Sequence, residues 1–260
     1  MRDGQANPRL ASYPSLLDKH VFVTGGGSGI GQAIVSAFAA QGARVSFVDI
    51  LDGPSRDLCA LLADAGWHRP LFRHCDLTDL DALERAMREL EEEAGDIEVL
   101  VNNAANDQRR AIGEVSPADW DRSVAINQRA AFFTCQAALP GLRRRRGAIV
   151  NVGSTCWRSK GAGYPVYASA KAAILGLTRA LARDLGPYGI RVNTVSPGWV
   201  MTERQLALWV DAAAEDEIAR NQCLPGKLMP NDVASMVLFL AADDSAMCTA
   251  QDFIVDAGWV

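Results

Sequence analysis

The sequence lacks the residues that mark metal, redox and membrane-spanning proteins. It has only three histidines, and its six cysteines are scattered with no Cys-x-x-Cys pair, so neither a metal site nor a redox dithiol is expected. The first 17 residues contain no uninterrupted apolar core of the signal-peptide kind, and no later stretch reaches the roughly 18 apolar residues of a membrane span. We therefore expect a cytoplasmic protein with reduced thiols and no membrane partner.

An excess of charge of one sign is also lacking. The formal net charge is −5, which gives no electrostatic reason to expect nucleic acid or an anionic membrane as a partner. The one basic cluster, Arg143 to Arg146, follows a predicted helix. Because cations are favoured at a helix C-terminus, a solvated helix end is a better interpretation than a phosphate-binding patch.

The chain does contain a regular alternation of β-branched runs and longer helical stretches. Because parallel strands are joined by crossover connections, this alternation predicts an α/β fold whose parallel sheet is covered by helices on both faces. Residues 1–17 are polar and contain glycine and proline, so we predict a flexible tail there and one domain over residues 18–260. The predicted strands cover residues 20–24, 43–49, 70–76, 97–103, 148–154, 190–196 and 252–256.

A glycine-rich turn follows the first predicted strand. It reads TGGGSGIG over residues 24–31, with the spacing GxxxGxG, and a helical stretch comes next. Glycines let a backbone approach a phosphate closely, and the start of a helix offers free N–H groups. A plain tight turn is the alternative, but the position between the first strand and the first helix favours a dinucleotide diphosphate. The predicted contacts are Gly25, Ser28, Gly29, Ile30 and Gly31.

Asp49, at the end of the second predicted strand, bears on the choice of cofactor. An acid at this place in a dinucleotide-binding fold bonds the adenosine ribose hydroxyls and repels a 2′-phosphate. Residues 26–28 and 50–51 contain no Lys or Arg that would attract this phosphate, so NAD is favoured over NADP, with an ordinary strand-ending Asp as the alternative. Asp76, after the third strand, has the same two interpretations, its alternative being a cap of the next helix near Thr78.

Tyr167 and Lys171 are the candidates for the chemistry. Four residues apart on a helix, they would share one face at about 5–6 Å. A free tyrosine has a pKa of about 10, and an ammonium at this distance favours the phenolate by roughly 3 kcal/mol, which would lower that pKa by about 2. Tyr167 would then act as a general base, and Ser154, at the end of a strand, would hold a substrate oxygen. In isolation such a pair is usually only a contact on a helix surface.

Together, these motifs resemble the short-chain dehydrogenase/reductase family over nearly the whole span from Lys19 to Val260. The resemblance implies a single Rossmann-like, doubly wound domain with a seven-stranded parallel sheet, commonly assembled as a homotetramer. One departure is Ala105, where the family usually has glycine and where a methyl group should slightly narrow the cofactor channel. The matching stretches are TGGGSGIG at 24–31, CDL at 75–77, NNAA at 102–105, Asn127, Ser154, YASAK at 167–171 and PGWVMT at 197–202.

The resemblance also implies roles for the matching residues. Tyr167 would be the acid/base, Ser154 would orient the reacting oxygen, and Lys171 would hold the nicotinamide ribose and lower the tyrosine pKa. Asn127 would be the fourth catalytic residue and support a water-linked proton path, although bending its helix or bonding the backbone explains this residue equally well on its own. Besides the glycine turn, the implied cofactor contacts are Asp49, Ile50, Asp76, Leu77, Asn103, Ala104, Ala105, Tyr167, Lys171, Pro197, Gly198, Val200 and Thr202.

The substrate pocket should form from the segments after the fourth, fifth and sixth strands, because ligands bind beyond the carboxyl ends of an open sheet. These segments combine indoles with polar side chains, which suits a polyhydroxylated ring better than a steroid or fatty acyl chain; packing at the core edge and solvation are the alternatives. The histidines all lie in the first third of the chain, which disfavours a Ser-His-Asp hydrolase. The predicted substrate contacts are Asn106, Ser154, Trp157, Tyr167, Trp199 and Gln205.

Two stretches, NNAANDQR at 102–109 and MCTAQDFIVDAGWV at 247–260, look like the sugar-oxidising branch of the family. These enzymes are NAD(P)-dependent aldose 1-dehydrogenases acting on galactose, fucose, arabinose, xylose or rhamnose, and the resemblance implies oxidation at C1 of a cyclic sugar to the lactone. A dehydrogenase or reductase for another carbonyl or alcohol, such as a 3-oxoacyl thioester or a polyol, is the alternative. A catalytically silent dinucleotide-binding scaffold is disfavoured by the intact catalytic set.

Overall fold

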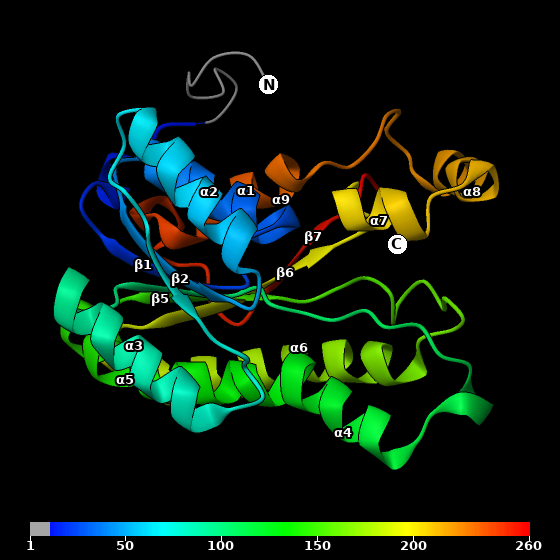
Figure 1. The fold of residues 1–260 in the computed structure, drawn as a ribbon, viewed down its shortest axis with the longest axis horizontal. Helices are drawn as coiled ribbons and strands as arrows, with labels where there is room; N and C mark the ends of the chain where they lie inside the picture. Colours follow the sequence, from blue (N-terminus) through cyan, green and yellow to red (C-terminus); the bar gives the residue numbers. More distant parts are fainter. Residues whose placement is uncertain (1–10) are drawn as a thin grey trace.

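The computed structural model describes residues 11–260 of the chain. Its centre is a seven-stranded sheet, parallel throughout, in the order β3-β2-β1-β4-β5-β6-β7 (Figure 1). The predicted seven-stranded parallel sheet is confirmed, and only β6 runs beyond its predicted end. The strands are β1 (His20–Thr24), β2 (Arg44–Asp49), β3 (Leu71–His74), β4 (Val99–Asn102), β5 (Ala148–Val152), β6 (Arg191–Pro197) and β7 (Asp252–Val255).

Helices cover both faces of the sheet, as the alternating pattern predicts. Side chains of β1 alternate between the two layers: Val21 and Val23 pack into the core beneath α1 and α9, and Phe22 packs into the core against α3 and α5. On one face lie α1 (Gly29–Ala40), α2 (Asp52–Asp64) and α9 (Pro230–Ala241), and on the other lie α3 (Leu80–Ala94), α4 (Pro117–Val124), α5 (Ala130–Arg145) and α6 (Pro165–Leu185) (Figure 1).

The shorter elements lie in the connections. Helices α7 (Glu203–Leu208) and α8 (Ala212–Asn221) follow β6 and lie beyond its carboxyl end (Figure 1). Within residues 11–260, no helix combines the length and the apolar character needed to cross a bilayer. Turns of 3-10 helix occur at Pro14–Leu16, Ile112–Glu114, Gly186–Tyr188 and Asp243–Ser245, and a π-helix occurs at Ala125–Arg129.

A chain of buried polar side chains attaches α5 and α6 to the sheet. The Asn102 amide donates to the Asn151 side-chain oxygen at 2.9 Å, and the Asn151 amide donates to Thr178 Oγ1 on α6 at 2.9 Å. Thr178 also shares a hydrogen bond with Thr194 at 2.8 Å, and Thr134 on α5 donates to Asn102 at 2.5 Å. Buried polar groups that satisfy one another specify a single arrangement of the elements they join, so α6 has a defined position on β5 and β6.

The strand order changes direction at β1, which pairs with β2 on one side and with β4 on the other. The connections that leave β1 and β4 therefore diverge to opposite faces. In open parallel sheets this divergence leaves a crevice beyond the carboxyl ends of the two strands, where ligands bind.

The chain joins the domain earlier than the sequence analysis predicts. Residues 14–16 form a turn of 3-10 helix, and Leu16 is fully buried in the core on the α1 side of the sheet. The predicted flexible tail over residues 1–17 is therefore wrong in its last part, because one apolar side chain in a polar stretch anchors it. Residues 1–10 lie outside the described part of the chain.

Leu16→Ala should lower the free energy of unfolding by about 2–5 kcal/mol, the usual effect of truncating a core leucine. Leu17→Ala is the matched control, because Leu17 is 60% exposed and its truncation should change stability by less than about 0.5 kcal/mol. Urea denaturation of both variants measures the difference. Equal losses would contradict the anchoring role of Leu16.

Candidate active site

The predicted site residues meet where several strands end at the crevice. β1 ends at Thr24, β4 at Asn102 and β6 at Pro197, and the predicted cofactor contacts continue directly from each of these ends. The structure thus brings together side chains from distant parts of the sequence, as expected for the carboxyl edge of a parallel sheet.

The glycine turn after β1 has the shape of a phosphate cradle. Gly25 and Gly29 have φ angles of +68° and +56°, which L side chains rarely adopt. A Cβ on Gly31 would lie 1.8 Å from the Gly25 carbonyl oxygen, so no larger residue fits there. The turn leads into α1, and the hydroxyl of Ser28 does not cap this helix. The first N–H groups of α1 are therefore available to an anion.

Side chains from two other strand ends contact the turn. Asn103, after β4, donates its side-chain amide to the Gly25 carbonyl at 2.9 Å and its backbone N–H to Thr24 Oγ1 at 3.0 Å. Thr202, after β6, lies so close that its methyl carbon would be 3.2 Å from a Cβ on Gly29. Predicted cofactor contacts from the segments after β1, β4 and β6 therefore share one site.

Asp49 braces the turn from the end of β2. Its Oδ2 accepts the Gly27 N–H at 2.8 Å, and its Oδ1 accepts the Leu51 N–H at 2.9 Å. A carboxylate can accept about four hydrogen bonds, so this structural role leaves capacity for ribose hydroxyls. A Cβ on Gly27 would lie 2.3 Å from Ser55 Oγ, a buried atom that has no partner within residues 11–260. The glycine cradle, the uncapped helix start and the acid at their edge fit a dinucleotide.

The Asp76 side chain stabilises a turn and does not cap a helix. Its Oδ1 accepts the Thr78 N–H at 2.9 Å, and this hydrogen bond is the main reason that its pKa lies below the usual value. The cap of α3 is Asp79, which accepts the Ala82 N–H at 2.9 Å. The predicted alternative of a helix cap at Asp76 is therefore wrong by three residues, because the helix begins later than expected.

Tyr167 and Lys171 share one face of α6, as their spacing predicts. Lys171 Nζ lies 5.9 Å from the centroid of the Tyr167 ring. The ammonium donates to the Val152 carbonyl oxygen at 2.7 Å, and the Lys171 residue is only 2% exposed. The last residue of β5 therefore sets the position of the face of α6 that carries Tyr167 and Lys171.

The prediction that the pKa of Tyr167 is lowered is wrong. Desolvation by the surrounding protein raises the pKa of Tyr167, with smaller contributions from Cys156 and Asp107, while a hydrogen bond with Ser154 opposes the rise. Desolvation also lowers the pKa of Lys171, to about 8. The prediction considered only the attraction between ammonium and phenolate, whereas removing either charged group from water is unfavourable.

Ser154 follows β5, close to the phenol that it bonds. Its Oγ also accepts the Cys156 N–H at 3.2 Å, which holds the hydroxyl in the turn before α6. The thiol of Cys156 lies in the same environment, where burial raises its pKa. It is therefore largely protonated at neutral pH and is a poor nucleophile.

Asn127 is buried in the π-helix between α4 and α5. Its Oδ1 accepts the Asn106 N–H at 2.9 Å, and its Nδ2 donates to the carbonyl oxygens of Asn106 and Ser123, both at 3.0 Å. The two alternatives considered for this residue, helix distortion and backbone bonding, are therefore both observed. A cavity of about 270 Å³ is lined by Asn127 and Lys171, while the water-linked proton path stays a prediction.

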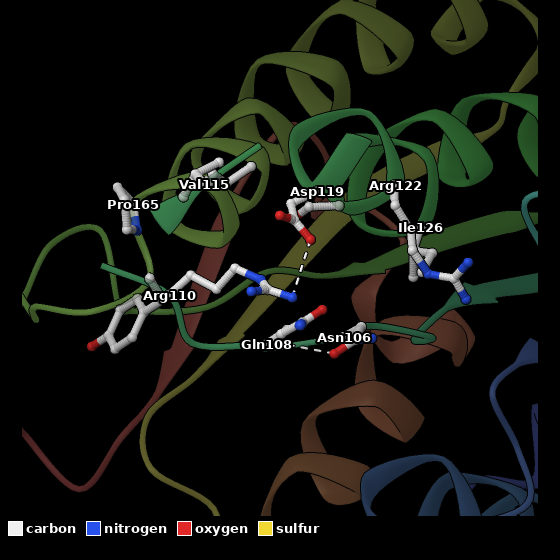
Figure 2. Close-up of a pocket in the computed structure, with 11 residues that line it drawn as sticks. Asn106, Gln108, Arg110, Val115, Asp119, Arg122, Ile126 and Pro165 are labelled. Atoms are coloured by element: carbon white, nitrogen blue, oxygen red, sulfur yellow. Dashed lines mark hydrogen bonds and ion pairs between the residues drawn. The ribbon is translucent and has the colours of Figure 1, made fainter. Parts of the chain in front are cut away.

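The segment 106–110 presents alternate side chains to two sides. Figure 2 shows Asn106, Gln108 and Arg110 beside a cavity of about 420 Å³ next to α4, where Arg110 pairs with Asp119 at 3.2 Å. The side chains of Asp107 and Arg109 contact different groups, from the segment after β6 and the residues before α6. The predicted substrate contact Asn106 is thus separated from its neighbour Asp107.

The segment after β6 forms a hydrogen bond and an ion pair with Asp107. Gln205 Nε2 donates to Asp107 Oδ2 at 2.7 Å, and Arg204 pairs with Asp107 Oδ1 at 3.0 Å. The Trp199 indole donates to Gln205 Oε1 at 3.0 Å. Two predicted substrate contacts, Trp199 and Gln205, therefore belong to one network with a carboxylate whose charge raises the pKa of Tyr167.

Two residues of this neighbourhood, Tyr164 and Trp209, were missed by the sequence analysis, whereas Arg109 lies in a predicted pocket segment. Arg109 lies over the rings of both Tyr164 and Trp209. The available signal was only proximity, because Tyr164 precedes Tyr167 by three residues and Trp209 follows the predicted pocket segment. Trp157, a predicted substrate contact, stacks under Arg158 at 4.5 Å and has a buried indole N–H without a partner in the described structure.

Comparisons with known proteins agree with this arrangement. A family model described as enoyl-(acyl carrier protein) reductase matches residues 25–260. A D-xylose 1-dehydrogenase of Caulobacter vibrioides is 46% identical over 96% of this chain and 98% of its own length. A probable galactose dehydrogenase of Rhizobium meliloti is 45% identical over 95% of this chain and 97% of its own.

A solved structure has the same fold. The crystal structure of a 3-oxoacyl-(acyl-carrier protein) reductase with bound NAD from Brucella melitensis matches with a TM-score of 0.87 and 31% identity, over 100% of this chain and 98% of that chain. The matched part of the chain includes the glycine turn, the segment with Tyr167 and Lys171, and the segment after β6. The chain therefore belongs to the short-chain dehydrogenase/reductase family, whose enzymes use a nicotinamide cofactor to interconvert alcohols and carbonyl compounds.

Proposed function

We propose that this chain is an NAD-dependent aldose 1-dehydrogenase that oxidises C1 of a cyclic sugar to the lactone. The observation that carries the proposal is the set of groups around the Tyr167 phenol. The phenol bonds Ser154 and lies near Lys171, and it is close enough to Asp107 of the polar pocket segment for that carboxylate to raise its pKa. A proton acceptor and a polar, aromatic pocket are therefore next to each other.

The relatives support a sugar as the substrate. Those named D-xylose 1-dehydrogenase and probable galactose dehydrogenase match this chain nearly end to end. The pocket agrees with that chemistry, because indole faces can pack against the C–H surface of a sugar ring while Asp107 and Gln205 bond its hydroxyls.

The chain supplies the proton transfer of the reaction. Oxidation of an alcohol carbon removes a hydride from the carbon and a proton from its hydroxyl, and a nicotinamide cofactor, when bound, would supply the hydride acceptor. Tyr167, as phenolate, takes the proton, and Ser154 hydrogen bonds the same substrate oxygen. Lys171, with a pKa of about 8, is mostly charged at neutral pH and favours the phenolate against the effect of burial. The onward path for this proton would pass the cavity that Lys171 and Asn127 line.

The residues that would hold the dinucleotide also favour NAD. The cradle of Gly25, Gly29 and Gly31 would receive the diphosphate, and Asp49 would accept hydrogen bonds from the adenosine ribose. A 2′-phosphate would bring its negative charge against the Asp49 carboxylate. The homotetramer stays a prediction from the family resemblance, and the cytoplasmic location stays a prediction from the sequence.

A panel of substrates tests the proposed function. With NAD, the purified protein should oxidise at least one of galactose, fucose, arabinose, xylose and rhamnose, with formation of reduced nicotinamide followed by absorbance and the lactone identified as product. A 3-oxoacyl thioester, assayed with reduced cofactor, and a linear polyol are the controls and should react much more slowly. Turnover of a control with no turnover of any aldose would reject the sugar assignment.

Tyr167→Phe should lower kcat by about 100- to 10,000-fold, because the variant has no group to take the proton. Binding of NAD, measured by fluorescence titration, should persist. Tyr188→Phe is the control, because this phenol is 45% exposed and lies under Arg143 at the far end of α6; it should keep its activity. A Tyr167→Phe variant with a near wild-type rate would rule out the phenol as the base.

Asp49→Asn should raise the ratio of kcat/KM with NADP to kcat/KM with NAD by about 10-fold or more. The amide keeps the size of the side chain, removes the repulsion of a 2′-phosphate and weakens a charge-assisted hydrogen bond to the ribose. Asp52→Asn is the control, because Asp52 is an exposed residue that pairs with His74. An unchanged ratio in Asp49→Asn would contradict a role of this carboxylate in cofactor choice.

A further inference from the structure

The segment 106–110 is attached on both of its sides. Toward α4, Arg110 pairs with Asp119, as Figure 2 shows, and the backbone of Asn106 bonds Asn127 in both directions. Toward the segment after β6, Asp107 bonds Arg204 and Gln205. Arg109 lies between these anchored neighbours, so its backbone position is well determined.

The Arg109 guanidinium is surrounded by three aromatic rings, two from the segment after β6 and one from the residue before α6. Its Cζ lies 4.2 Å from the ring centroid of Trp209, and 5.5 Å from those of both Trp199 and Tyr164. A guanidinium packs its flat face against aromatic rings and directs its five N–H donors outward in its own plane. The rings therefore hold the cation without satisfying its hydrogen bonds.

The N–H donors of the Arg109 side chain have no acceptor in the part of the protein that the structure describes. Within residues 11–260 the Arg109 guanidinium makes no hydrogen bond or ion pair, in contrast to Arg110, Arg158 and Arg204, which pair with carboxylates. The indole N–H of Trp209, on which Arg109 packs, is buried and also has no partner in this part of the chain. A half-buried cluster of donors without acceptors suits a ligand rich in oxygen.

Tyr164 places this cluster relative to the catalytic phenol. The Tyr164 and Tyr167 rings meet edge to face, with centroids 6.3 Å apart, and the Tyr164 ring also contacts Arg109. The Tyr164 ring therefore lies between the Arg109 guanidinium and the Tyr167 ring. With C1 of a sugar at Tyr167, the hydroxyls on the opposite side of the sugar ring would point toward Arg109.

We propose that Arg109 is a specificity-determining residue, whose guanidinium donates hydrogen bonds to adjacent ring hydroxyls remote from C1. The proposal rests on the proposed aldose oxidation. The planar fork of an arginine matches two neighbouring oxygens, which a lysine ammonium cannot do. The position of those oxygens on the ring distinguishes one epimer from another, so Arg109 contributes to the choice between aldoses.

A cycle of enzyme variants and substrate analogues tests the proposal. kcat and KM are measured for wild type and Arg109→Gln with the preferred aldose and with its 3-deoxy and 4-deoxy analogues. Arg109→Gln should lower kcat/KM on the parent aldose by about 10- to 100-fold, mainly through KM. On the analogue that lacks the bonded hydroxyl, wild type and variant should agree within about twofold.

Arg110→Gln is the matched control, because Arg110 is the next residue and faces α4 (Figure 2). Its effect should be the same factor on the parent aldose and on both analogues. Arg109→Lys keeps the charge beside the rings and should still lose most of the discrimination between the parent aldose and its deoxy analogues. If circular dichroism shows that Arg109→Gln is unfolded, the same cycle is run with Arg109→Lys.

The outcomes separate the two claims. If Arg109→Gln loses the same factor on the parent aldose and on both analogues, Arg109 supports the pocket without contacting these hydroxyls, and the assignment is overturned while the proposed function stands. If the wild-type enzyme oxidises no aldose, the proposed function fails and the Arg109 assignment fails with it.

Discussion

The site depends on the buried attachment of α6 to the sheet. Lys171 donates to the Val152 carbonyl, and two turns further along α6 Thr178 joins the buried chain formed with Asn151 and Thr194. A buried ammonium without an acceptor is strongly unfavourable, so the helix cannot slide along β5 without losing this contact. Because Ser154 follows Val152 by two residues, the same attachment determines how Ser154 and Tyr167 meet.

Burial positions Tyr167 and Lys171, but it also makes it harder for either side chain to carry a charge. The same packing that orders the phenol and the ammonium also disfavours the charged form of each, raising the pKa of Tyr167 and lowering that of Lys171 to about 8. Asp107, which links the pocket segments, adds to the rise. The pKa of Tyr167 therefore depends on groups from several segments of the chain. Any charged or polar group that enters the pocket would change this pKa.

The segment 106–110 connects the π-helix with the segment after β6. Through Asn106 it is held by the buried Asn127 of the π-helix, a type of helical irregularity that is frequent at functional sites. Through Asp107 and Arg109 it gathers Trp199, Gln205 and Trp209 from the segment after β6. One extended stretch, with side chains alternating between two sides, thus relates the position of the segment after β6 to that of the π-helix.

The sequence by itself determined the parallel sheet, the glycine cradle and the shared face of Tyr167 and Lys171, because each follows from local periodicity or from residues close together in the chain. It also marked the family, through motifs in a fixed order. Only the tertiary structure decided that Leu16 is buried, that desolvation prevails over the ammonium at Tyr167, and that Arg109 lies among three aromatic rings. These features depend on burial and on contacts between distant segments, and neither quantity exists until the chain has folded.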